Sequence, residues 1–115
     1  MRIDVSFKYL ENSDFIKNVL ENNFRKVKRR VQMFRRDDPI HISVHIEKNP
    51  HKEQFFCRSH VYLPSSKVLA ADEKGINSSV AINKTFSALA KQLDKEKNKW
   101  QKQRRKARQE PKDQF

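Results

Sequence analysis

The sequence predicts an α+β domain in the order β-α-β-β-β-α: a four-stranded sheet with two helices packed on one face. Two kinds of periodicity lead to this prediction, because short segments alternate apolar and polar residues as strands do, and two longer segments repeat apolar residues at helical spacing. The turns between the last three strands are too short for anything but antiparallel hairpins. The two helices must therefore cover the same face of the sheet.

The first strand and the first helix open the chain. Residues 2–8 alternate in the manner of a half-buried strand. Its apolar side comprises Ile3, Val5 and Phe7. Residues 12–14, Asn-Ser-Asp, supply a helix cap, and the helix is predicted to end near Phe34, before the break at Pro39. The apolar positions of this helix are Ile16, Leu20, Phe24, Val27, Val31 and Phe34.

Three further strands are predicted in the middle of the chain. Residues 40–47 alternate most clearly, and residues 54–63 alternate again after a turn at Asn49-Pro50-His51. Residues 67–71 are predicted to form a short fourth strand. Residues 72–75 are predicted to lead from this strand into the second helix.

Residues 77–108 are predicted to form one long helix, because they contain neither glycine nor proline and open on residues that cap helices. At about 100° per residue, its apolar residues fall on one stripe. The stripe comprises Ile82, Phe86, Leu89, Leu93 and Trp100. The opposite side carries the lysine row, which comprises Lys84, Lys91, Lys95 and Lys102. Only Asp94 and Glu96 are acidic here, so the row predicts binding to an extended polyanion.

A second basic surface lies on the first helix, which has no acidic residue between Asn22 and Arg36. Its back carries Arg25, Arg29 and Arg36, and its flanks carry Lys26, Lys28 and Arg30. With both helices on one face, the two basic rows lie side by side and can hold an RNA backbone on both sides of a groove. The domain is predicted to span residues 1–100, followed by a basic, flexible or partly helical tail over residues 101–115.

The charge of the chain indicates the class of its partner. The net charge is +12, the pI is near 10.1 and 35% of residues are charged, which favours nucleic acid over an anionic membrane surface. No run approaches the ~20 apolar residues of a membrane span, and the N-terminus has no signal pattern. We therefore expect a cytoplasmic protein with no membrane partner.

Two alternatives concern the face of the sheet away from the helices. His41, His45 and His60 project from that side and suggest an imidazole metal site, but no acidic or cysteine residue is placed to complete it, so no metal is predicted. Phe56 and Tyr62, together with His60, suggest base stacking of the kind seen in RNA-recognition sheets. The lysine row is the stronger electrostatic feature.

The sequence does not support catalysis. A single glycine, Gly75, cannot build a phosphate-binding loop or a glycine-rich hydrolytic motif. Cys57 has no second cysteine to pair with, and it is interpreted as a small buried apolar residue of a strand. We therefore expect no enzyme, no cofactor and no small-molecule substrate.

Two segments of this chain resemble a known family. The strand sequence ISVHIEKN and above all the helix sequence VAINKTFSALAKQLDKEKNKW are similar to the ribosome hibernation factors, the hibernation-promoting and ribosome-associated inhibitor proteins once called sigma-54 modulation proteins. The similarity covers about residues 2–100. Its most specific positions are Ala81, Ile82, Leu89, Gln92, Leu93, Lys95, Lys97 and Lys99, with Phe24 and Lys26 in the first helix.

The resemblance implies a non-catalytic short form of this family that binds the small ribosomal subunit in the mRNA and tRNA channel near the decoding site. Such a protein inhibits translation and stabilises inactive ribosomes under stress and in stationary phase. The implied partners are 16S-type rRNA and 70S or dimerised ribosomes. The expected rRNA-binding residues are Arg25, Lys26, Lys28, Arg29, Lys84, Lys91, Lys95, Lys99 and Lys102.

The chain departs from the family where its second helix begins. Ser78-Ser79 and Asn83 stand where family members usually carry a Met-Tyr pair and an aspartate. A double-stranded-RNA-binding domain has a similar topology, but its Gly-Pro-x-His loop and Lys-Lys-x-Ala-Lys helix start are absent from this sequence. A double-stranded-RNA-binding or ribosome-assembly protein without hibernation activity is the alternative function.

Overall fold

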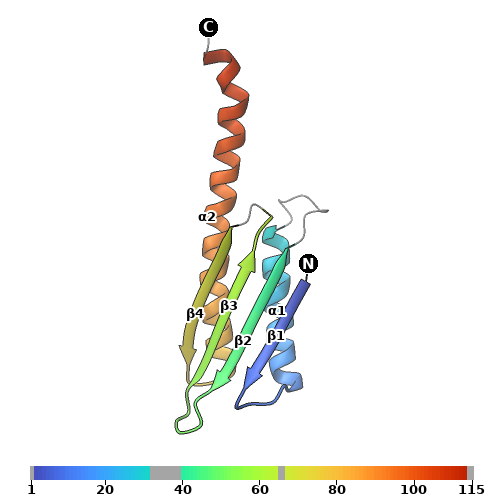
Figure 1. Ribbon diagram of the computed structural model, residues 1–115, viewed down its shortest axis with the longest axis vertical. Coiled ribbons are helices and arrows are strands. Elements are labelled where there is room, and N and C mark those ends of the chain that lie inside the picture. The colour runs from blue at the N-terminus through green and yellow to red at the C-terminus, as the bar shows by residue number, and fades with distance from the viewer. Residues whose placement is uncertain (1, 32–39, 65–66, 114–115) are drawn as a thin grey trace.

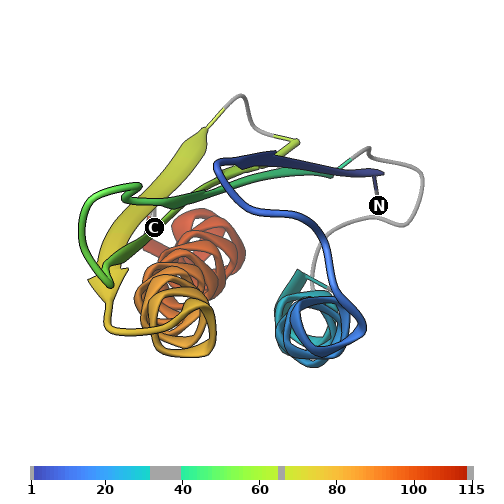
Figure 2. The same cartoon turned by 90° about the horizontal axis from the view of Figure 1, so that it is seen from below.

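The computed structural model describes residues 2–31, 40–64 and 67–113, and the side chains within these ranges except Trp100 and residues 103–113. The elements are β1 (Arg2–Lys8), α1 (Asp14–Val31), β2 (His41–Lys48), β3 (Phe55–Tyr62), β4 (Val68–Gly75) and α2 (Ser78–Asp113). They form one four-stranded sheet in the order β1-β2-β3-β4, with both helices on one face (Figures 1 and 2). The predicted α+β fold is confirmed.

The direction of each strand follows from its connection. β2, β3 and β4 pair antiparallel through short turns, as predicted. β1 pairs parallel to β2, because α1 carries the chain back along the sheet before β2 begins. Both helices consequently run antiparallel to the strands that precede them, and parallel to each other.

The core lies between the helices and the inner face of the sheet, the face that the helices cover. The apolar positions of β2 and β3 alternate into it as predicted, and α2 supplies Ile82, Phe86, Leu89 and Leu93 from the predicted stripe. Trp100, the last member of that stripe, lies outside the described side chains. The buried hydroxyl of Thr85 donates a hydrogen bond to the carbonyl oxygen of Ala81 at 2.8 Å, so this polar group has a hydrogen-bond partner inside the core.

Both helices begin where the sequence predicts a cap. The hydroxyl of Ser13 accepts a hydrogen bond from the Ile16 amide at 3.2 Å, and the Asn77 side chain accepts one from the Val80 amide at 2.8 Å. The predicted end of the first helix, Phe34, lies outside the described residues. The second helix extends to Asp113, farther than the predicted residue 108.

The fourth strand is longer than predicted. The sequence predicts a connection over residues 72–75, but they continue β4 in register with β3, from Arg58↔Asp72 to Phe55↔Gly75. The extension is held by contacts across the strands: Arg58 forms an ion pair with Asp72 at 3.4 Å, and the Lys74 ammonium lies 5.5 Å from the centre of the Phe56 ring.

The connection from β4 to α2 is correspondingly tight, and glycine is required in it. A Cβ atom at Gly75 would lie 2.6 Å from the backbone nitrogen of Ala81, which is closer than real Cβ contacts allow. The absent side chain therefore lets α2 start directly over the end of the strand.

Candidate nucleic-acid interface

The two helices that carry the predicted basic residues lie on one face of the sheet (Figure 2). Figure 2 shows α1 and α2 next to each other beneath the sheet. All nine predicted rRNA-binding residues are exposed to solvent. They are Arg25, Lys26, Lys28 and Arg29 on α1, and Lys84, Lys91, Lys95, Lys99 and Lys102 on α2. The predicted side-by-side placement of the two basic helices is thus present in the structure.

Direct contacts fix the spacing between the helices. The rings of Phe24 and Phe86 meet edge to face, with centroids 5.6 Å apart and an interplanar angle of 79°. Beside them, the Asn23 amide nitrogen donates to Asn83 Oδ1 at 2.9 Å. This hydrogen bond ties the second helix to the first. These contacts hold the two basic surfaces in a fixed relation.

The two acidic residues closest in sequence to the lysine row, Asp94 and Glu96, turn away from it. Asp94 faces α1, where its Oδ1 lies 3.4 Å from Arg30 Nε in an ion pair between the helices. Glu96 faces β4, where it binds Lys67 and lies 3.7 Å from the ammonium of Lys99. The hydrogen bond to Glu96 raises the pKa of Lys67. Among the described side chains, no ion pair includes a member of the lysine row.

The basic residues of α1 divide between two flanks. Arg25 and Lys28 line a hollow together with Ile3, so they lie toward β1. Lys26 lies one helical turn before Arg30 and therefore on the flank that faces α2. Arg36, which was predicted to continue the row, is outside the described residues. Lys26 is thus the member of the α1 set that lies on the flank toward α2.

The far end of α2 projects beyond the sheet (Figure 1). At 1.5 Å per residue, its 36 residues span about 54 Å, whereas the eight residues of β4 span about 27 Å. Glu96 contacts Lys67 next to the β3–β4 turn, and Lys99 and Lys102 follow it along the helix. The lysine row therefore continues, at Lys102, past the length of α2 that matches β4.

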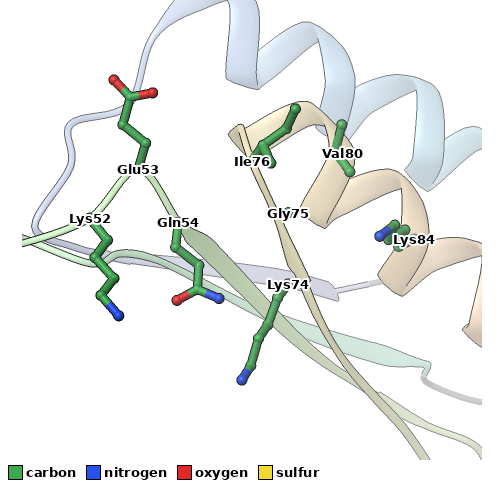
Figure 3. A pocket seen from close by; sticks show the side chains of 8 residues that line it. All are labelled: Lys52, Glu53, Gln54, Lys74, Gly75, Ile76, Val80 and Lys84. Carbon is green, nitrogen blue, oxygen red and sulfur yellow. The ribbon is translucent and has the colours of Figure 1, made fainter.

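A pocket at the other end of α2 adds basic residues that the sequence analysis did not include. This end pocket has a volume of about 640 Å³ and lies between the β2–β3 turn and the start of α2 (Figure 3). It is lined by Lys52, Glu53, Gln54, Lys74, Gly75, Ile76, Val80 and Lys84. Because its three lysines come from three separate elements, no local pattern in the sequence marks it. The end pocket brings Lys84, the first member of the lysine row, together with Lys52 and Lys74.

The histidines of the outer face, the sheet face away from the helices, bond within the sheet. His41 Nε2 lies 2.5 Å from Asp4 Oδ2, and His45 Nδ1 lies 2.8 Å from the Ser6 hydroxyl. No group of three metal-binding side chains occurs among the described residues. The imidazole metal site is therefore not assembled in this part of the chain.

The aromatic residues of the outer face stack on one another. The Tyr62 ring stacks with His41 at 5.2 Å and with His60 at 6.2 Å between centroids. Two exposed cations of this face, Arg58 and Lys8, pair with the carboxylates of Asp72 and Glu47, and a third, Lys74, lies over the Phe56 ring. These cations have partners within the sheet, whereas no ion pair among the described side chains includes a member of the lysine row.

Cys57 is fully buried in β3, as predicted. Burial raises the pKa of its thiol to about 11, so the thiol is protonated at neutral pH. A protonated buried thiol is a poor nucleophile, and this fits a packing role. In the described part of the chain, neither helix has a stretch apolar enough to cross a bilayer.

Comparison with known proteins gives one matching family. The family model described as "Sigma 54 modulation protein / S30EA ribosomal protein" matches residues 3–101. No curated protein sequence matches the chain.

Two solved structures share the fold. The N-terminal domain of Protein Y from Thermus thermophilus has a TM-score of 0.64 and 20% identity, covering 83% of this chain and 98% of that one. A ribosomal subunit interface protein from Coxiella burnetii has a TM-score of 0.66 and 17% identity, covering 85% and 99%.

Proposed function

The chain belongs to the sigma 54 modulation protein / S30EA ribosomal protein family, and on this premise we propose that it is a hibernation factor that binds the small ribosomal subunit. The observation that carries the proposal is the lysine row. Its four members are exposed, and both acidic residues beside them are engaged on other flanks of α2. Such a row of ammonium groups can neutralise phosphates along an RNA backbone.

In this proposal, the two helices contact ribosomal RNA in the mRNA and tRNA channel near the decoding site. The nine exposed basic residues of the two helices contact phosphates, with those of α1 on one side of the RNA backbone and those of α2 on the other. Contacts to phosphate position a protein without reading sequence, which suits a fixed site on one RNA. The bound protein blocks translation by occupying the channel, and it stabilises 70S or dimerised ribosomes under stress in the cytoplasm.

The first prediction concerns salt. Each phosphate that a lysine or arginine neutralises releases bound counterions, so affinity falls as salt rises. With roughly six to eight phosphates neutralised, the slope of log K against log salt should be about −4 to −7. Sedimentation of the protein with small subunits over a salt series measures this slope. A slope near zero would show that the basic helices are not the interface.

The second prediction concerns the mode of inhibition. If occupancy alone blocks translation, inhibition is complete when protein and ribosomes are equimolar, and it reverses on dilution or with excess tRNA. A cell-free translation assay measures both, with the rRNA analysed for integrity after incubation. Cleaved or modified rRNA would contradict occlusion. Equal affinity for isolated RNA duplexes and for small subunits would favour a general double-stranded-RNA-binding protein instead.

A further inference from the structure

The two edges of the sheet differ in how they are covered. At the β4 edge, the Gln92 amide nitrogen of α2 donates to the carbonyl oxygen of Ala70 at 2.8 Å, which occupies a backbone acceptor of the edge strand. Lys67, just before β4, is bound by Glu96 of the same helix. Among the described residues, no side chain makes a comparable hydrogen bond to the backbone of β1. An uncovered edge strand is a template for pairing with another strand.

The inner face of β1 is also less covered than that of its neighbour. Ile3 and Val5 are 36% and 37% exposed, whereas Ile42, which pairs with Ile3, is 0% exposed. α1 lies beneath β1 (Figure 2), but a hollow lined by Ile3 and by residues of α1 remains between the two elements. Part of the apolar side of β1 is therefore exposed.

A hollow lies between β1 and α1. This edge hollow has a volume of about 410 Å³ and is lined by Ile3, Glu21, Phe24, Arg25 and Lys28. Its apolar surface comes from Ile3 and Phe24, and two cations and one carboxylate stand around it. The volume of the edge hollow is large enough for apolar side chains. Its lining has one more cation than carboxylate, which favours a ligand that carries carboxylates.

The backbone of β1 presents unpaired groups directly above the edge hollow. The Arg2 amide donates to the carbonyl oxygen of Ile40 at 2.9 Å, so the even-numbered residues of β1 form the parallel ladder with β2. The N–H and C=O groups of Ile3, Val5 and Phe7 consequently point away from the sheet. The same residues direct their side chains to the inner face. A strand added at this edge would therefore meet the outward backbone groups of these three residues and, on the inner face, their side chains.

We propose that β1 accepts an extended acidic segment of a partner protein as an additional strand. The backbone of the segment pairs with Ile3, Val5 and Phe7, its apolar side chains enter the edge hollow, and its carboxylates meet Arg25 and Lys28. Strand addition obtains affinity from backbone hydrogen bonds and specificity from alternate side chains. The proposal goes beyond the proposed ribosome binding, because it assigns a protein partner to a sheet edge.

A second copy of this chain is a poorer occupant. Each copy carries a net charge of +12, and antiparallel pairing of two β1 strands about Val5 would place Arg2 opposite Lys8. An RNA backbone matches Arg25 and Lys28, but it offers no regular series of amide donors and carbonyl acceptors for the strand edge. An acidic extended peptide matches the edge, the hollow and the charge together.

The test uses the whole chain and the synthetic ten-residue peptide Val-Thr-Glu-Thr-Val-Thr-Glu-Thr-Val-Thr, in which valine and glutamate occupy alternate positions on the same face of the strand. Binding should be saturable, and in NMR hydrogen exchange it should slow the amides of Ile3, Val5 and Phe7. The amides of Asp4 and Ser6 should change little, since they already bond to β2. A peptide with lysine in place of glutamate should bind at least about tenfold more weakly, because two cations then face it.

The matched variants are Val5→Pro and Val68→Pro. Both valines lie on edge strands, and both amides point away from the neighbouring strand, so proline removes an outward donor without breaking the ladder. Val5→Pro should weaken peptide binding at least about tenfold, and Val68→Pro should leave it unchanged. Neither should alter small-subunit binding, which separates this proposal from the proposed function.

Two results would overturn the proposal: equal peptide binding by Val5→Pro and wild type, or slowed exchange at β4 instead of β1. If Val5→Pro fails to fold, Ile3→Glu takes its place, because Ile3 is partly exposed and a carboxylate there repels the peptide. If Ile3→Glu binds the peptide as tightly as wild type does, the proposal is overturned. Peptide-induced dimers, detected by light scattering, would assign the edge to a second copy and also overturn it.

Discussion

Changing Lys91 and Lys95 together to Glu is expected to lower small-subunit affinity by at least about tenfold, or about 1.4 kcal/mol. Both residues belong to the lysine row, and the substitutions replace two attractions to RNA phosphates with two repulsions. The fold should be unaffected, since both side chains are exposed and lie opposite the buried stripe of α2. Sedimentation of each variant with small subunits at fixed salt measures the loss.

The control for this pair must carry the same change of charge on another surface. Arg2 and Lys8 serve, because they lie on the outer face of the sheet and each forms an exposed ion pair. Lys52 is unsuitable, since it lines the end pocket together with Lys84. The Arg2→Glu, Lys8→Glu variant should lose far less affinity. Equal losses from both variants would show a diffuse attraction to net charge and would contradict a helical RNA site.

The parts of the fold that periodicity determines could be predicted from the sequence. A strand buried on one face must alternate, as residues 41–48 do, and a helix on a sheet must repeat its apolar residues as α2 does. The helix starts could be predicted as well, because Ser13 and Asn77 can satisfy free amides from their own side chains. These signals are local, so each segment carries them on its own.

The end of β4 could not be predicted in this way. Asp72, Glu73 and Lys74 are charged and show no apolar alternation, and a run of that kind usually indicates a turn. They extend the strand because Arg58 and Phe56 stand opposite Asp72 and Lys74 on β3. Only the register between the two strands brings those partners together, and register is a property of the folded sheet.

The candidate site also has features that the sequence predicts and features that only the fold brings together. The lysine row follows from 3.6 residues per turn, so all four members could be identified before the fold was known. The ion pair of Arg30 with Asp94 joins two helices that are far apart in the sequence, and it leaves the row without a neighbouring carboxylate. The edge hollow and the end pocket each combine separate elements. Their residues have no common spacing that a sequence pattern could reveal.

The last prediction concerns the aromatic contact that sets the spacing of the helices. Phe86 is 2% exposed and its ring meets Phe24 edge to face, so Phe86→Ala removes core packing and the direct contact between α1 and α2. The free energy of unfolding should fall by about 3–5 kcal/mol. Equilibrium denaturation in urea measures this, with Phe15→Ala as the matched control.

Phe15 is 62% exposed on the same helix as Phe24, and its truncation should cost less than about 0.5 kcal/mol. The contrast is informative because both substitutions delete the same atoms. Phe86→Ala should also weaken small-subunit binding under conditions in which it remains folded, since the basic surfaces of α1 and α2 then lose their fixed spacing. Stability and affinity that fall equally in the two variants would show that the contact between Phe24 and Phe86 does not hold the helices in place.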